Sequence, residues 1–97
     1  MKIIKSFFNN SVYLLQPNIY SDNRGEFSET YNKSKFKELG INNIFTQDNY
    51  SKSIKKLTFR GIHLQLKPFQ QAKLVRVIKG EIIYYIVDLR LKSKFFG

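Results

Sequence analysis

Two side chains in this sequence could carry out proton-transfer chemistry together. The single histidine, His63, lies in the run R-G-I-H-L-Q (60–65), between two apolar residues that would occupy the other face of an extended strand. Lys73 begins the next predicted strand, on the face that it shares with two valines. Inside an apolar β interior both side chains would be desolvated, which favours their neutral forms and suits proton abstraction or charge stabilisation. Alone, however, a strand histidine is more often a hydrogen-bonded structural residue, and a lysine at a strand start more often lies on the surface.

Other polar residues stand where a half-buried strand would prefer apolar ones. Gln47 and Asn49 share one strand face, and Arg24, Glu29 and Arg60 are isolated charges close to aromatic residues. Because a glycine follows Arg60, its guanidinium fork could reach a phosphate group. The alternative roles are turn formation for Arg24, strand-edge solubility for Gln47 and Asn49, and a surface ion pair for Glu29.

The elements that would position these residues are mainly short strands. The turn signature D-N-R-G (22–25) separates two extended segments, after which Phe27, Glu29 and Tyr31 share one strand face. A two-turn helix is predicted over Lys33–Leu39, with Gly40 as its C-terminal cap. Further extended segments are expected at 10–16, 44–51, 57–66, 72–78 and 81–89, the last two as a hairpin around residues 79–80.

This pattern predicts a mainly all-β fold, a sandwich or barrel with one short helix near 33–39. No linker, repeat or low-complexity segment interrupts residues 1–97, so we expect one domain. The sequence stops just after its most apolar predicted strand, and we therefore expect this domain to be partial.

The composition excludes several classes of site. The absence of cysteine excludes a disulfide framework, a thiolate metal site and a cysteine nucleophile, and one histidine leaves no histidine cluster for zinc. We therefore expect no metal. No apolar run approaches the length of a membrane span, and the N-terminus lacks the apolar stretch of a signal peptide, so we expect a cytoplasmic protein without a membrane partner.

The formal charge of +10 points to an anionic partner only weakly. The sequence has seventeen lysines and arginines and only seven acidic residues. Many of the lysines, however, lie in two loose groups, and no block of five like charges occurs. No nucleic-acid-binding motif is present either. A solvated, lysine-rich surface is therefore favoured over a nucleic-acid interface.

Five segments in one order resemble the N-terminal half of the dTDP-4-dehydrorhamnose 3,5-epimerase family. They are D-N-R-G-E-F-S-E (22–29), F-T-Q-D-N-Y-S-K-S (45–53), R-G-I-H-L-Q (60–65), Q-A-K-L-V-R-V-I-K-G-E (71–81) and V-D-L-R (87–90). The resemblance implies a cupin-type jelly roll, incomplete here. It also implies an isomerase that epimerises C3 and C5 of a dTDP-4-keto-6-deoxyhexose without a cofactor, in dTDP-L-rhamnose biosynthesis.

The resemblance also implies roles for single residues. His63 matches the proton acceptor, and Lys73 matches the lysine beside the C4 oxygen, where it stabilises the enolate. Arg24 and Arg60 match contacts to the nucleotide diphosphate. The remaining matches are substrate contacts: Phe27, Glu29, Gln47 and Asn49. Family members are homodimers in which the region 24–29 contributes to the partner's site.

The sequence departs from the family pattern at several points. In the family, the second half of the sequence supplies the tyrosine that donates a proton and the aspartate that orients the histidine. Neither residue is found in these 97 residues. Tyr84 stands where the family usually has an acid near the lysine, and Leu64 replaces a common tyrosine. We expect an epimerase-type chain that carries the base and part of the substrate site. The alternative is a truncated, non-catalytic remnant or a dTDP-sugar-binding fragment.

Overall fold

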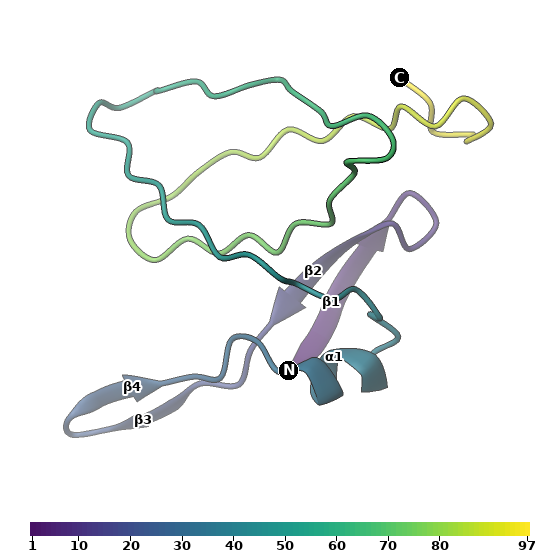
Figure 1. Cartoon of the computed structure of the whole chain (residues 1–97). Coiled ribbons are helices and arrows are strands. Elements are labelled where there is room, and N and C mark those ends of the chain that lie inside the picture. Colours follow the sequence, from purple (N-terminus) through teal and green to yellow (C-terminus); the bar gives the residue numbers. More distant parts are fainter. The chain divides into compact units, whose positions relative to one another are not determined.

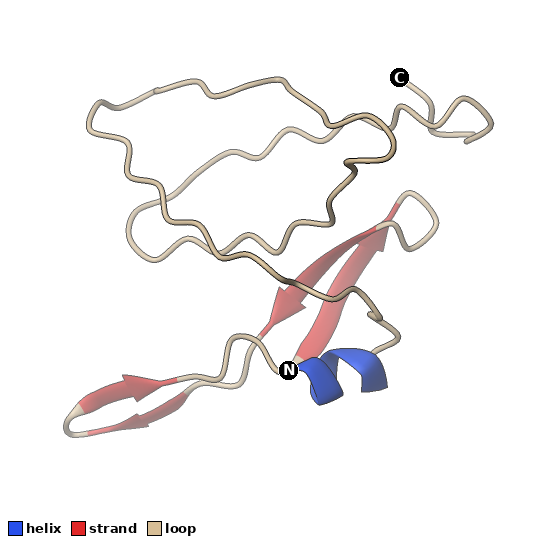
Figure 2. Ribbon diagram, in the orientation of Figure 1, coloured by secondary structure: helices blue, strands red, loops and turns tan.

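The computed structural model describes all residues 1–97, which form two compact units. The first unit comprises residues 1–42 and 87–97, and the second comprises residues 43–86. Figure 1 and Figure 2 show that every named helix and strand belongs to the first unit. In chain order they are β1 (Lys2–Phe7), β2 (Val12–Gln16), β3 (Tyr20–Asp22), β4 (Gly25–Phe27) and α1 (Lys33–Glu38). The mainly β fold class is confirmed, and the elements fit an incomplete cupin-like fold.

The first pair of strands, β1 and β2, forms an antiparallel hairpin. Its register runs from Lys2 opposite Gln16 to Phe7 opposite Val12, with an irregularity between Ile3 and Lys5. Such a bulge places one extra residue on the strand and increases its twist. The strand expected over 10–16 is confirmed for its last five residues, whereas β1 was not predicted from the sequence.

The turn between β1 and β2 has an unusual backbone. Phe8, Asn9 and Asn10 all adopt the left-handed region, with φ of 51°, 53° and 57°. Asparagine tolerates this region, but a bulky side chain such as that of Phe8 rarely enters it. Contacts from outside the hairpin are therefore needed to hold this turn.

The second hairpin, β3–β4, contains the predicted D-N-R-G turn. Tyr20 pairs with Phe27 and Asp22 pairs with Gly25, so the turn is confirmed. The strand after it is shorter than expected, because β4 ends at Phe27. Glu29 and Tyr31 therefore do not share a strand face with Phe27. The chain leaves the sheet at Ser28, whose hydroxyl donates to the Asn18 carbonyl oxygen at 2.8 Å.

The predicted helix is confirmed as α1, and its ends follow local rules. Asn32 is the N-cap, and its side-chain oxygen accepts hydrogen bonds from the amides of Ser34 and Lys35 at 3.0 and 3.1 Å. Gly40 ends the helix with a φ of +81°, a conformation that glycine adopts without strain. The amide of Ile41 then returns to the Phe36 carbonyl oxygen at 2.9 Å.

The fully buried side chain of the first unit is Phe36 of α1. It is 1% exposed, and Ile41 beside it is 8% exposed. The Tyr31 ring meets Phe36 edge to face at a centroid distance of 5.0 Å. A six-residue helix is too short to be stable alone, so these contacts supply its stability.

The C-terminal residues 87–97 join the first hairpin through a network around Asp88, whose side chain is 3% exposed. The Arg90 guanidinium donates to both carboxylate oxygens at 2.9 and 2.7 Å, and the Ser93 hydroxyl donates to one at 2.6 Å. The same guanidinium donates to Ser11 Oγ at 2.6 Å and to the Phe8 carbonyl oxygen at 3.1 Å. We call these five residues the Asp88 clasp. It holds the left-handed turn from outside the hairpin.

The clasp is reinforced by aromatic and backbone contacts. The rings of Phe8 and Phe95 meet edge to face at 5.6 Å, and the amide of Gly97 donates to the Asp88 carbonyl oxygen at 2.9 Å. Hydrogen bonds from Arg90 and Ser93 hold the pKa of Asp88 well below its usual value of 3.8. The carboxylate is thus ionised and fully engaged near neutral pH.

The second unit has no helix and no strand. Figure 1 shows it as an open loop, in which backbone turns such as the one from Leu66 to Phe69 separate extended stretches. The predicted strands over 44–51, 57–66 and 72–78 are therefore wrong here. The strand over 81–89 is wrong too, apart from an isolated bridge between Asp88 and Phe96. A strand forms only where a neighbour completes its hydrogen-bond ladder and its apolar face is covered, and these stretches have neither.

The structure contains no helix that is both long and apolar enough to cross a membrane.

Replacing the buried aromatic ring tests the core of the first unit. Phe36→Ala is expected to lower the free energy of unfolding of this unit by about 3–5 kcal/mol, the usual cost of emptying a buried phenylalanine site. Hydrogen exchange of the Leu39, Gly40 and Ile41 amides in urea would measure it. Ile19→Ala is the control, because Ile19 is 57% exposed and its truncation should cost little. Equal losses in both variants would contradict this account of the core.

A second variant tests the Asp88 clasp and its pH dependence. Because the folded-state pKa of Asp88 is lowered, its contribution to stability is complete above the unfolded value of 3.8 and is lost as the pH falls through the folded value. The Gly97 amide, followed by NMR, should therefore lose protection on acidification, and at every pH in Asp88→Asn. The matched control is Asp22→Asn, which removes a 48% exposed carboxylate from the same Asp-x-Arg spacing. Unchanged Gly97 protection in Asp88→Asn would refute the clasp.

Candidate functional site

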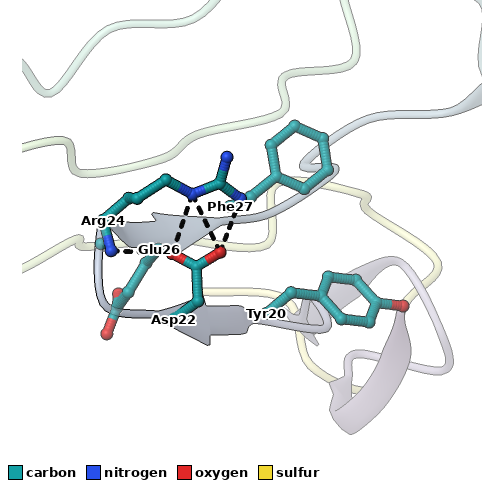
Figure 3. A pocket seen from close by; sticks show the side chains of 6 residues that line it. Tyr20, Asp22, Arg24, Glu26 and Phe27 are labelled. Atoms are coloured by element: carbon teal, nitrogen blue, oxygen red, sulfur yellow. Dashed lines mark hydrogen bonds and ion pairs between the residues drawn. The ribbon is translucent and has the colours of Figure 1, made fainter.

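The β3–β4 hairpin carries a shallow surface hollow with two of the predicted site residues, Arg24 and Phe27. Figure 3 shows the Arg24 side chain extending along β4 toward Phe27, while the Glu26 carboxylate points away from the guanidinium. Both Phe27 and Tyr20 are largely exposed, at 70% and 62%. The hollow thus combines one cation, Arg24, with two carboxylates and two aromatic rings. Its lining is Tyr20, Asp22, Arg24, Gly25, Glu26 and Phe27.

The Arg24 guanidinium is oriented by Asp22. The Asp22 carboxylate accepts hydrogen bonds from Arg24 Nε at 3.1 Å and Nη2 at 2.6 Å, and it also caps the Arg24 amide at 2.8 Å. These bonds lower the pKa of Asp22 and raise that of Arg24, since each ion stabilises the other. The Arg24 side chain nevertheless remains 85% exposed and therefore accessible to an anion.

The third predicted site residue of the first unit, Glu29, turns toward the helix. Its carboxylate forms an ion pair with Lys35 at 2.7 Å and accepts a hydrogen bond from Asn32 at 3.1 Å. The bond from Lys35 is the main reason that the pKa of Glu29 is lowered. Glu29 therefore ties the segment after β4 to the start of α1. It does not line the hollow of Arg24 and Phe27.

The predicted polar residues of the second unit form two local groups. The Gln47 amide donates to Asn49 Oδ1 at 3.1 Å, so these two side chains do lie together. Arg60 turns back along the chain, where Nε lies 3.3 Å from Ser53 Oγ and Nη2 lies 3.4 Å from the Lys52 carbonyl oxygen. These long, exposed bonds hold the guanidinium only loosely, and an anion could displace them.

The structure leaves both His63 and Lys73 exposed to solvent. The expected desolvation inside an apolar β interior is therefore wrong here, because the strands that would enclose the two side chains do not form. The imidazole of His63 lies against Gly61, where a Cβ atom would approach Nδ1 to 3.3 Å. Gly61 also has a φ of +120°, so a larger residue at this position would be strained as well as crowded.

The predicted site residues thus fall into both units. The first unit brings Arg24 and Phe27 together on one hairpin, and the second brings Gln47 and Asn49 together. The sequence analysis missed Tyr20, Asp22 and Glu26 as lining residues. Asp22 had a usable signal in the sequence, because an aspartate at the start of a turn commonly accepts a hydrogen bond from the backbone amide two residues later. No group of three or more histidine, aspartate or glutamate residues could hold a metal ion.

Comparison with known proteins assigns the chain to a family. A sequence model of the dTDP-4-dehydrorhamnose 3,5-epimerase family matches residues 9–97. A dTDP-4-dehydrorhamnose 3,5-epimerase from Shigella flexneri is 42% identical over 98 residues, covering 100% of this chain and 53% of its own length. Another from Methanothermobacter thermautotrophicus is 43% identical over 97 residues, covering 99% of this chain and 50% of its own. A dTDP-4-dehydrorhamnose 3-epimerase from Streptomyces niveus is 34% identical over 87 residues.

No solved structure matches the fold. The chain spans about half the length of the first two relatives. The family match nevertheless extends over most of the chain, and it contains all of the predicted site residues between Arg24 and Lys73. On this evidence the chain belongs to the dTDP-4-dehydrorhamnose 3,5-epimerase family.

Proposed function

We propose that this chain carries the proton-accepting part of a sugar-nucleotide 3,5-epimerase site and part of its substrate site. The observation that carries the proposal is the family match over residues 9–97, because all eight proposed site residues fall inside it. The substrate is a dTDP-4-keto-6-deoxyhexose, and the reaction inverts its C3 and C5 centres. Both carbons lie next to the C4 ketone, so their protons are the acidic ones in the sugar.

The chemistry assigns distinct roles to His63 and Lys73. The imidazole of His63 accepts the proton from carbon, and the electron pair of the C–H bond moves into the ring to form an enolate at C4. The ammonium of Lys73 stabilises the negative oxygen. A proton that comes from solvent water then adds to the opposite face of the same carbon, and the ketone at C4 is restored. No electrons are gained or lost overall, so the reaction requires no redox cofactor.

The remaining residues hold the substrate. The guanidinium groups of Arg24 and Arg60 bind the diphosphate, for which paired N–H donors are well suited. Their exposure supports this role: the Arg24 side chain is 85% accessible, and Arg60 is held only by long hydrogen bonds. The other substrate contacts are Phe27, Glu29, Gln47 and Asn49.

The β3–β4 hairpin is the part that we expect to reach a second copy of the chain in a homodimer. Its rings at Tyr20 and Phe27 are 62% and 70% exposed and would gain from burial against a partner. The Arg24 side chain would then contribute to the partner's site.

The second candidate function is binding of a dTDP-sugar without turnover, as a non-catalytic remnant of the family. Its support is the exposure of His63 and Lys73, which leaves both side chains in bulk water. Incubation with dTDP-4-keto-6-deoxyglucose in D₂O separates the two. Deuterium at C3 or C5 supports the epimerase. Binding of dTDP without deuterium incorporation supports the second candidate, and absence of both contradicts both.

Removal of the imidazole tests the assignment of the base. His63→Ala should lower deuterium incorporation by at least about 10²-fold, since general-base catalysis contributes at least this much. The affinity for dTDP should stay unchanged, because His63 acts on the sugar and not on the nucleotide. Gln70→Ala, in the same unit, is the control and should exchange normally. Persisting exchange in His63→Ala would show that another group is the base.

Removal of the ammonium tests enolate stabilisation. Lys73→Met should slow exchange by about 10²–10³-fold, the typical effect of deleting one donor to a developing oxyanion. Lys79→Met provides the matched control, because Lys79 is an exposed lysine of the same unit. A loss of dTDP affinity with an unchanged exchange rate at saturating substrate would instead make Lys73 a nucleotide-binding residue.

A further inference from the structure

The Asp22 carboxylate occupies one edge of the Arg24 guanidinium. Asp22 Oδ2 accepts hydrogen bonds from Arg24 Nε at 3.1 Å and from Nη2 at 2.6 Å, and Oδ1 lies 3.3 Å from Nε. A guanidinium carries five N–H donors in a planar fork, and these contacts use the N–H of Nε and one N–H of Nη2. Figure 3 shows the third nitrogen, Nη1, on the side away from the carboxylate. The outer edge of the fork, between Nη1 and Nη2, therefore faces away from Asp22.

The same carboxylate also fixes the backbone from which the Arg24 side chain starts. Asp22 Oδ1 accepts a hydrogen bond from the Arg24 amide at 2.8 Å, and Asp22 pairs with Gly25 across the hairpin. Both the base and the tip of the Arg24 side chain are thus held by one residue of β3. An arginine that is 85% exposed would otherwise sample many rotamers, and a ligand would have to order it on binding. The contact with Asp22 restricts this freedom before a ligand arrives.

The charge of Asp22, taken alone, opposes the binding of an anion. Glu26 is the second carboxylate of the same hollow, and both negative charges would repel an anion beside Arg24. A favourable contribution of Asp22 to anion binding can therefore come only from the geometry that it imposes on the guanidinium. Glu26 imposes no such geometry, because its carboxylate points away from the guanidinium (Figure 3). The two carboxylates of one hairpin thus separate the effect of charge from the effect of position.

We propose that Asp22 is a positioning residue of the substrate site, which holds the Nε edge of Arg24 so that the outer edge meets the diphosphate. Two N–H groups of that edge, one on Nη1 and one on Nη2, would donate to two oxygens of one phosphate group. Asp22 itself does not touch the substrate. This role rests on the proposed function, in which Arg24 binds the diphosphate.

The test compares two variants of the full chain that each remove one negative charge from the hollow. Asp22→Asn keeps an oxygen that can cap the Arg24 amide, but it replaces the Oδ2 acceptor of Nε and Nη2 by an amide donor. We expect it to weaken dTDP binding about three- to tenfold, because binding must then order the arginine side chain. Glu26→Gln, the matched control, should bind dTDP at least as tightly as the unchanged chain, because it only removes repulsion. Isothermal titration calorimetry at one ionic strength measures both affinities.

A spectroscopic readout reports the position of Arg24 without a ligand. In NMR spectra, the Arg24 Nε–H should exchange slowly with water in the unchanged chain and in Glu26→Gln, and fast in Asp22→Asn. Cross-strand contacts between Tyr20 and Phe27, which pair in the hairpin, should persist in Asp22→Asn. Loss of these contacts would show that Asp22 acts on the fold of the hairpin, and it would overturn the positioning role.

The remaining outcomes separate this role from the proposed function. Equal dTDP affinities of Asp22→Asn and Glu26→Gln would overturn the positioning role, as would tighter binding by Asp22→Asn or an unchanged exchange rate of the Arg24 Nε–H. If Arg24→Ala weakens binding in the same experiment, Arg24 keeps its place in the proposed function while Asp22 loses its own. An unchanged affinity in Arg24→Ala would contradict the diphosphate contact of Arg24 itself, and absence of dTDP binding by the unchanged chain would contradict both.

Discussion

The buried carboxylate of Asp88 connects the two ends of this chain. Through Arg90 it reaches the Phe8 carbonyl oxygen and Ser11, so a contact across 82 residues of sequence fixes the turn between β1 and β2. Its ionised form is surrounded by donors, which is why the carboxylate can be 3% exposed without an uncompensated charge. Without this network the left-handed turn would keep only its Ser11–Phe7 backbone hydrogen bond and the ring contact between Phe8 and Phe95, and residues 87–97 would lose their polar contacts to the first hairpin.

The contrast between the two units follows from a general requirement of β structure. A hairpin with a short turn satisfies its own ladder, and β1–β2 and β3–β4 accordingly form within the chain. The predicted hairpin around residues 79–80 has an equally short turn but forms no ladder, so a short turn is not sufficient when the apolar faces of the strands are left uncovered. Residues 43–86 contain the residue types of strands but no completed ladder, and their apolar side chains remain exposed. The same requirement explains why His63 and Lys73 lie in solvent: an apolar interior exists only once the strands around it are paired.

Some features of the candidate site could be predicted from the sequence, and others could not. The resemblance of the five segments to the epimerase family identified the family, which the match over residues 9–97 confirms. Local chemistry predicted the D-N-R-G turn and the helix with its glycine cap, because the residues that form them are adjacent in sequence. The partners of the site residues were not predictable. Strand alternation predicted that Glu29 lies on the same face as Phe27. Instead, β4 ends at Phe27, and the Glu29 carboxylate forms an ion pair with Lys35 of α1.

The sequence by itself determined the family, the mainly β class, the turn at 22–25 and a helix near 33–39, since each depends on residue identity or on neighbours a few positions apart. Only the tertiary structure decided which predicted strands form, because a strand depends on a partner that the local pattern does not specify. It also decided that Asp88 and Arg90 bind the first hairpin, whereas Asp22 and Arg24, with the same spacing, remain on an exposed turn. Burial separates the two pairs: one carboxylate is enclosed by Arg90 and Ser93, and the other is open to water.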